Sequence, residues 1–374
     1  MNTGDNNLEL FAVVAPGLEE IVAGELNQLN LEKIKRLPGG VSFSGDFGSL
    51  MQANLWLRCA TRVLLRVARF PVFHLAQLDK RAHRVDWAKY LSADLRVKVS
   101  ASCRRSRIYH SGAACERVMK AIADVTGCSD DKNGCGRHQT VQVRIEKDVC
   151  VISLDSSGDP LYQRGLKPEV TAAPIRETLA AAILKMCGYD GSQALLDPMC
   201  GSGTFVMEAA ALAHGLAPGL RRSFAFMDWP GFDKAAWKRQ LERCKSISHS
   251  SRSVGLFASD GNAGAIGKTK RNLKLAGLAE SVLVERCLIS DLQPPARTGL
   301  LVCNPPYGKR LRDNRNLNLL YAELGSVFRK QFSGWQFGMI TTQHHLADAT
   351  GLKFNKVSDR IPHGGLKIRL YQAG

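Results

Sequence analysis

The sequence predicts an α/β protein in which a doubly wound parallel sheet follows two smaller α+β units. Short apolar strands alternate with helices after residue 165, which is typical of a parallel sheet with helices on both faces. A glycine-rich loop in that half follows an apolar run and precedes an amphipathic stretch, as a nucleotide-binding loop does. The first 160 residues carry a simpler pattern of strands and helices, and 374 residues suffice for two or three hydrophobic cores.

Residues 1–70 are expected to form the first α+β unit. An apolar strand at 8–14 leads into a helix with Leu18, Val22 and Leu26 at helical spacing. The turn at 38–40 precedes an alternating strand at 41–44. A further helix around residues 50–60 and a strand at 63–70 complete the unit.

Residues 71–160 are expected to form a second α+β unit that ends at Gly158-Asp159-Pro160. Its polar loop at 129–138 is expected to protrude. The predicted elements, after a first helix, are a strand at 96–101, a helix at 114–126 and strands at 140–145 and 149–155.

Residues 161–374 are expected to form the doubly wound domain. A long insertion at 215–252 interrupts it and carries the aromatic residues Phe224, Phe226 and Trp229. The predicted strands are 194–197, 255–259, 281–286, 299–303, 336–341 and 367–371, and the predicted helices are 175–186, 204–214, 263–276 and 319–332.

The composition predicts a globular protein with a polyanionic partner. The formal net charge is +17, and more of this excess lies after residue 165 than before it. The eleven cysteines form no C-x-x-C pair and no cluster at metal-ligand spacing, so reduced thiols and no metal site are expected. No apolar run has the length of a membrane span and the first residues are polar, so we expect a cytoplasmic protein without a membrane partner.

The loop from Asp197 to Phe205 indicates a nucleotide-like cofactor. It follows the first strand of the doubly wound domain and opens a helix, where free N–H groups attract an anion such as the methionine carboxylate of S-adenosylmethionine (SAM). Gly201 and Gly203 allow close backbone approach, and a phosphate loop would end in Gly-Lys-Ser/Thr, which is absent. Asp260 ends the next strand, where an acid accepts hydrogen bonds from ribose hydroxyls. A tight turn alone would explain the glycines but not Asp260.

The sequence Asn304-Pro305-Pro306-Tyr307 indicates chemistry on an exocyclic amine. The lone pair of such an amine is delocalised, so two acceptors, the Asn304 side-chain oxygen and the Pro305 carbonyl, would bind its hydrogens and aim its lone pair. The prolines stiffen the loop, and Tyr307 offers a stacking face to a flipped base. A proline-rich turn with a surface tyrosine is the simpler alternative, but the motif follows an apolar strand on the same sheet edge as the glycine loop.

Cys303 and Cys200 are the competing candidates, as nucleophiles for methylation at carbon. Cys303 ends an apolar strand and Cys200 lies inside the glycine loop. Neither is aimed at a base, so both are interpreted as packing residues.

These motifs, with Pro174–Ala181, Ala15–Glu20 and Asp155–Asp159, resemble the THUMP-domain-containing RNA guanine-N2 methyltransferases. The resemblance covers almost the whole chain and is strongest to the methyltransferase unit of the bacterial enzymes that act on 23S rRNA. It implies a ferredoxin-like domain over 1–70, an RNA-binding THUMP domain over 71–160 and a Rossmann-like class I SAM methyltransferase domain over 161–374.

The resemblance also implies the site residues. Catalytic roles fall to Asn304, Pro305, Pro306 and Tyr307. The SAM-binding residues are Pro174, Asp197, Met199, Cys200, Gly201, Ser202, Gly203, Thr204, Phe205, Asp260, Asn262, Leu288 and Asn304. Where the family often places an acid near the adenine this chain has Leu288, with Asp291 three residues later. The resemblance covers one methyltransferase unit and not the second one that is fused to it in some members, so we expect a single methylation.

The expected activity is therefore formation of N2-methylguanosine, in 23S rRNA or, as the first alternative, in tRNA. A DNA adenine or protein glutamine N-methyltransferase shares the Asn-Pro-Pro-Tyr motif, and an RNA-binding factor with a degenerate catalytic domain is a third class. The N-terminal 160 residues, with the basic run Arg104-Arg105-Ser106-Arg107, favour RNA, although such a run is often only a solvated face.

Overall fold

The computed structural model describes residues 7–131, 138–165, 175–247, 255–307 and 314–374. The chain divides into two compact units, which are described separately. Unit 1 contains residues 1–14, 22–161 and 222–241, and unit 2 contains residues 15–21, 162–221 and 242–374.

Unit 1 is built on an eight-stranded sheet with the strand order β2-β3-β1-β4-β8-β7-β5-β6. Most neighbours are antiparallel, whereas β5 is parallel to β6 and β7. The strands are β1 (Leu8–Val13), β2 (Glu32–Leu37), β3 (Gly40–Gly45), β4 (Arg62–Pro71), β5 (Arg96–Arg104), β6 (Ser129–Asp130), β7 (His138–Glu146) and β8 (Val149–Asp155). The helices are α1 (Glu19–Gln28, of which residues 22–28 belong to this unit), α2 (Phe47–Trp56), α3 (Leu75–Ala82) and α4 (Ser111–Thr126).

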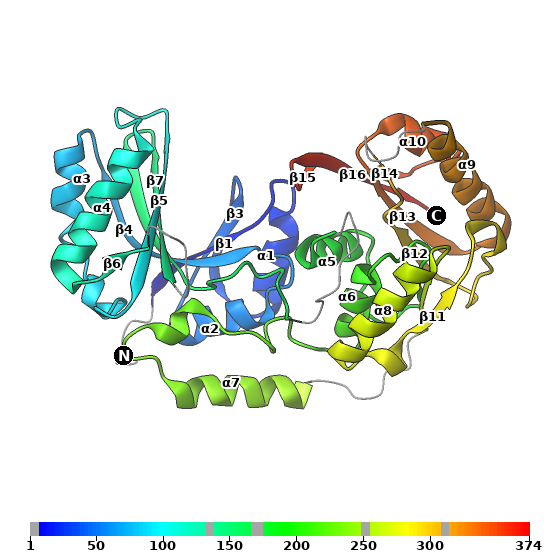
Figure 1. The fold of residues 1–374 in the computed structure, drawn as a ribbon, viewed down its shortest axis with the longest axis horizontal. Coiled ribbons are helices and arrows are strands. Elements are labelled where there is room, and N and C mark those ends of the chain that lie inside the picture. The colour runs from blue at the N-terminus through cyan, green and yellow to red at the C-terminus, as the bar shows by residue number, and fades with distance from the viewer. Residues whose placement is uncertain (1–6, 132–137, 166–174, 248–254, 308–313) are drawn as a thin grey trace. The chain divides into compact units, whose positions relative to one another are not determined.

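The sheet of unit 1 crosses the predicted boundary at residue 70. Strand β4 pairs with β1 on one side and with β8 on the other, so segments 1–70 and 71–160 share one sheet. Helices α3 and α4 pack together and cover one face of the outer strands (Figure 1). Alternating residues of β5 are exposed because they point away from these helices, and the corresponding residues of β7 are mostly half-buried.

Unit 2 has the predicted alternation of strands and helices around a mainly parallel sheet. Its main sheet has the order β11-β10-β9-β12-β13-β16-β14. The strands from β11 to β13 are parallel, and β16 runs antiparallel to both of its neighbours, β13 and β14. The strands are β9 (Leu195–Asp197), β10 (Leu256–Asp260), β11 (Leu283–Arg286), β12 (Gly299–Cys303), β13 (Trp335–Thr341), β14 (Lys356–Val357), β15 (Ile361–His363) and β16 (Leu366–Ala373). The helices are α5 (Glu177–Met186), α6 (Thr204–Ala213), α8 (Ala263–Ala276), α9 (Asn314–Gln331) and α10 (His344–Ala349).

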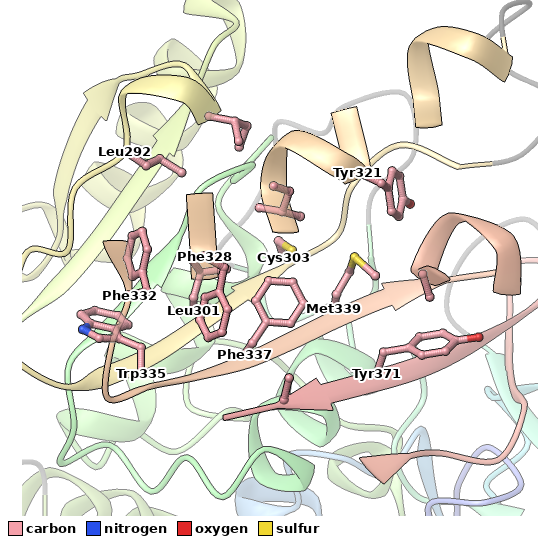
Figure 2. Packing of buried hydrophobic residues seen from close by; sticks show 14 of the residues in the cluster. Leu292, Leu301, Cys303, Tyr321, Phe328, Phe332, Trp335, Phe337, Met339 and Tyr371 are labelled. Atoms are coloured by element: carbon pink, nitrogen blue, oxygen red, sulfur yellow. The ribbon is translucent and has the colours of Figure 1, made fainter. Parts of the chain in front are cut away.

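A hydrophobic core fixes strands β12 and β13 against helix α9. Tyr321 and Phe328 of the helix pack with Cys303, Phe337 and Met339 of the strands, all of them buried (Figure 2). The apolar residues recur every three or four positions along the helix, so one face of α9 enters this core. The packing holds the carboxyl end of β12, where the Asn-Pro-Pro-Tyr sequence begins.

The insertion at 215–252 contains structure that the sequence analysis did not identify. A short 3₁₀ helix at Ala225–Asp228 precedes helix α7 (Lys234–Ile247). Residues 222–241 pack in unit 1, although the sequence on both sides belongs to unit 2. Strand β2 in unit 1 was also missed, because its residues are mostly charged and lack the alternation of a half-buried strand.

Candidate active site

The glycine-rich loop connects β9 to α6 at the carboxyl edge of the sheet in unit 2. Gly201 and Gly203 have φ angles of 57° and 85°, which side-chain-bearing residues rarely adopt. A Cβ on Gly203 would lie 2.9 Å from Cγ2 of Thr269. The N-cap residue of α6 is Gly203, which has no side chain to accept from the first turn, and the backbone N–H groups of that turn lie beside the loop.

Two buried polar residues of α8 donate hydrogen bonds to this loop. Thr269 donates a hydrogen bond to the Gly201 carbonyl (3.1 Å), and Asn272 donates to the Ser202 carbonyl (3.0 Å). Both residues are fully buried. Sequence reasoning missed them, although two polar residues three positions apart on the apolar face of a helix were a usable signal.

Asp260 fixes the loop from the neighbouring strand. Its carboxylate accepts hydrogen bonds from the backbone nitrogens of Gly201 (3.0 Å) and Asn262 (2.9 Å). Each carboxylate oxygen has a further lone pair, so these bonds leave capacity for ribose hydroxyls. Asn262 caps α8 by accepting from the backbone nitrogens of Gly264 and Ala265.

Asp197, at the end of β9, is buried beneath the same loop. It accepts a hydrogen bond from the backbone nitrogen of Met199 (3.2 Å). Desolvation raises the pKa of the Asp197 carboxyl well above its usual value, and the charge of Asp260 raises it further. The position indicates that Asp197 supports the loop rather than offering an exposed carboxylate.

Leu288 lies next to this group of residues. It is 55% exposed, and its Cδ2 atom would be 3.1 Å from a Cβ on Gly261, the residue after Asp260. An exposed apolar side chain beside the Asp260 carboxylate suits a contact with the face of an adenine ring. Pro174, by contrast, lies outside the described residues.

The Asn-Pro-Pro-Tyr sequence continues directly from β12, whose five residues are all buried. The side-chain oxygen of Asn304 is buried and has no hydrogen-bond partner within the described parts of the chain. Tyr321 of α9 donates a hydrogen bond to the Pro306 carbonyl (3.3 Å), which fixes the loop, and Tyr307 packs partly buried against the core of Figure 2. The described residues therefore position a buried hydrogen-bond acceptor that none of them uses.

The sheet order places the two loops at one edge. Strand β9 lies between β10 and β12, and all three are parallel. Asp197, Asp260 and Asn304 therefore end neighbouring strands at the same edge, the usual ligand site of an open α/β sheet.

The two cysteines do not have the properties of nucleophiles. Cys303 and Cys200 are buried, and desolvation raises the pKa of both thiols far above the usual range. These positions support the packing interpretation.

The residues at this edge fit SAM. Gly201 and Gly203 hold the loop in backbone angles that side-chain-bearing residues rarely adopt, the first turn of α6 can offer N–H groups to a carboxylate, and Asp260 can accept from ribose hydroxyls. Among the described residues, no group of His, Cys, Asp and Glu could hold a metal ion. No described helix is long and apolar enough to cross a membrane.

Two family models match the chain. The model of the RMKL-like methyltransferase domain matches residues 164–367, and that of the RlmL ferredoxin-like domain matches residues 9–64. The protein slr0064 of Synechocystis sp., assigned as an RNA methyltransferase, is 34% identical, and the match covers 96% of this chain and 95% of slr0064.

A second relative and a solved structure extend this picture. The ribosomal RNA large subunit methyltransferase K/L of Methylococcus capsulatus is 34% identical, and the match covers 97% of this chain but only 50% of the relative. The chain thus spans about half the length of that enzyme. The crystal structure of SMU.472 complexed with SAH superposes with a TM-score of 0.88 at 28% identity and covers 98% of both chains.

Proposed function

This chain belongs to the RMKL-like family of SAM-dependent methyltransferases, and from that premise we propose that it methylates the exocyclic N2 of a guanine in ribosomal RNA. The observation that carries the proposal is the buried side-chain oxygen of Asn304, which lacks a partner among the described residues. A buried acceptor without a partner costs about 1–3 kcal/mol, so its presence supports a role toward a bound ligand that supplies a donor. An exocyclic amino group supplies two.

The chemistry at the site follows from the positions of three groups. SAM, when bound, supplies an electrophilic methyl group on its sulfonium. Asn304 Oδ1 and the Pro305 carbonyl accept hydrogen bonds from the amino hydrogens, which removes the nitrogen from conjugation and directs its lone pair. Tyr307 stacks on the base, and the hydrogen bond from Tyr321 to the Pro306 carbonyl keeps the loop in place.

Three groups of residues would hold SAM. The N–H groups at the start of α6 would bind its carboxylate, Asp260 would accept from its ribose hydroxyls, and Leu288 would contact its adenine. Thr269 and Asn272 keep the loop in shape through hydrogen bonds to its carbonyls.

The choice of RNA rests on the relatives and on charge. The names of slr0064 and of the K/L enzyme assign RNA and ribosomal RNA to those proteins. The net charge of +17 suits a polyanionic substrate. Residues 71–160 are proposed to form the THUMP domain that binds it, with tRNA as the alternative substrate.

The decisive experiment identifies the product. Labelled SAM and purified protein are incubated with RNA from cells that lack the protein, and the modified nucleosides are separated by mass spectrometry. N2-methylguanosine that is missing in those cells and restored in vitro is the expected result. Transfer in parallel reactions to adenine in DNA or to glutamine in protein, with none to the RNA, or no transfer at all, would each contradict the proposal.

A further inference from the structure

A basic and aromatic surface lies at one end of the sheet in unit 1. Three segments that are far apart in the sequence contribute to it: residue 73 after β4, residues 104–109 after β5, and the turn at 147–148 between β7 and β8 (strands in Figure 1). We call the following side chains the rim patch: Phe73, Arg104, Arg105, Arg107, Tyr109 and Lys147.

Hydrogen bonds join the three segments into one built surface. Lys147 donates its backbone N–H to the Arg104 carbonyl (3.2 Å), and Val72 donates to the Asp148 carbonyl (2.7 Å). Arg107 donates its backbone N–H to the Asp148 carboxylate (2.7 Å). The patch therefore has a defined backbone, with Arg105 held at a φ of 48° in the left-handed region.

The positive charge of the patch is largely unneutralised. Arg105 and Arg107 form no ion pair with any residue described in the structure. Of the neighbouring acids, Asp148 already accepts from the Arg107 backbone, and Glu146 pairs with Arg144 at 2.6 Å. The charges of Arg144, Arg104 and Lys147 also contribute to a lowered pKa of Glu146, so several cations share one carboxylate.

Two aromatic rings are exposed among these cations. Tyr109 is 73% exposed and Phe73 is 38% exposed. The guanidinium of Arg107 lies 5.1 Å from the centroid of the Phe73 ring. Exposed rings beside arginines can stack on bases while the arginines bind phosphates, which is how proteins hold unpaired strands.

We propose that the rim patch binds an unpaired segment of the RNA substrate, with Arg105, Arg107 and Lys147 on phosphates and Tyr109 and Phe73 stacked on bases. The inference rests on the proposed function for RNA as the substrate. It adds the place of contact in unit 1 and the form of RNA that this place selects, because bases inside a duplex do not expose their faces for stacking.

The first arm of the test removes charge. Full-length protein is titrated with a fluorescent single-stranded RNA of about twelve nucleotides at several salt concentrations. The triple variant Arg105→Gln/Arg107→Gln/Lys147→Gln should bind about tenfold more weakly or worse. Its log–log salt dependence should be shallower by about 2, because each lost single-strand phosphate contact removes about 0.7 from the slope. The matched control Lys80→Gln/Arg117→Gln/Lys120→Gln removes the same charge from exposed positions on α3 and α4 and should bind like the wild type.

The second arm tests stacking. Tyr109→Ala should weaken binding of the single strand about fivefold or more, whereas Tyr109→Phe should retain it because the ring remains. A blunt RNA duplex of equal length should bind Tyr109→Ala as it binds the wild type. Unchanged affinity in the charge triple, equal loss in the control triple, or equal loss of duplex binding in Tyr109→Ala would overturn the inference.

The proposed function fails separately from this inference. Methyl transfer by the wild type is scored on cellular RNA, whereas the patch is scored on binding of the oligonucleotide. If all variants bind like the wild type and methyl transfer occurs, only the patch is wrong. If no methyl transfer occurs, the titrations still show whether the rim patch binds single-stranded RNA.

Discussion

Asn304 shows how a single residue indicates function through what it leaves unsatisfied. Its side-chain oxygen is buried at the end of β12, where no described group donates to it. Most buried acceptors in folded proteins have a partner, and an exception at a ligand edge is a stability cost that a substrate can offset. Cys303, one residue earlier, is fully buried, and desolvation raises the pKa of its thiol well above the usual value.

At the residue scale, we predict that Asn304→Ala lowers the single-turnover rate of methyl transfer by about 10²–10³. Affinities for SAM and for RNA should stay near those of the wild type, because the oxygen acts on the reacting amine. The free energy of unfolding should not fall, since the change removes an unsatisfied polar group.

The control at this position is Cys303→Ser. A thiolate mechanism requires this variant to be inactive, whereas the amine mechanism requires substantial activity. Full activity of Asn304→Ala, or a product methylated on carbon, would rule out the mechanism.

Helix α8 is the element that gives the cofactor loop its shape. Thr269 and Asn272 donate hydrogen bonds to consecutive carbonyls of the loop, and the Thr269 side chain also occupies the position next to which a Cβ on Gly203 would lie. The loop therefore depends on an element more than sixty residues away in the sequence, and its glycine is required for space as well as for dihedral angle.

At the element scale, we predict that Gly203→Ala weakens SAM binding at least tenfold in calorimetry. The added Cβ would lie 2.9 Å from Thr269, so either the loop or α8 must shift. Gly188→Ala is the matched control, because Gly188 has a similar φ of 76° but nothing within 4 Å of a new Cβ. Gly188→Ala adds comparable backbone strain outside the loop and should leave SAM affinity near that of the wild type, whereas wild-type affinity in Gly203→Ala would contradict the role of this glycine in the loop.

At the scale of the whole molecule, the division of the chain into two units does not follow the order of the sequence. Residues 222–241 belong to unit 1 although they are inserted in the sequence of unit 2. Arg222 donates hydrogen bonds to the carbonyls of Pro160 (2.7 Å) and Ser157 (3.1 Å), and buried Trp229 donates to the Gln139 side chain (2.7 Å). The rings of Phe224 and Phe226 stack on each other, and Trp237 makes a T-shaped contact with each of them.

We therefore predict that Trp229→Ala destabilises unit 1 by about 3–5 kcal/mol, the usual cost of truncating a buried large aromatic residue. Denaturant unfolding followed by circular dichroism measures the change, while calorimetry should find SAM affinity largely retained, because the cofactor residues lie in unit 2. Tyr109→Ala is the control, since the exposed ring should contribute little to stability. An unchanged free energy of unfolding in Trp229→Ala would refute the proposed contribution of the insertion to unit 1.

The sequence by itself determined the local features of this protein. The strand, glycine loop and helix around Gly201, the strand that ends at Asn304 and most of the alternating elements of unit 2 follow from short-range periodicity and turn chemistry. These features involve neighbouring residues, so the pattern along the chain suffices to predict them. The methyltransferase family and the ferredoxin-like segment were identified for the same reason, because their motifs are short and contiguous.

Only the tertiary structure decided which distant segments meet. The placement of β9 between β10 and β12 brings Asp260 and Asn304 to one edge, and the pairing of β4 with β8 joins two predicted units in one sheet. The support of the loop by Thr269 and the packing of Trp229 in unit 1 are likewise long-range. Bringing distant segments together costs chain entropy, and this cost is offset only when the whole core packs. The pattern of neighbouring residues does not show which distant faces are complementary, so it cannot predict these contacts.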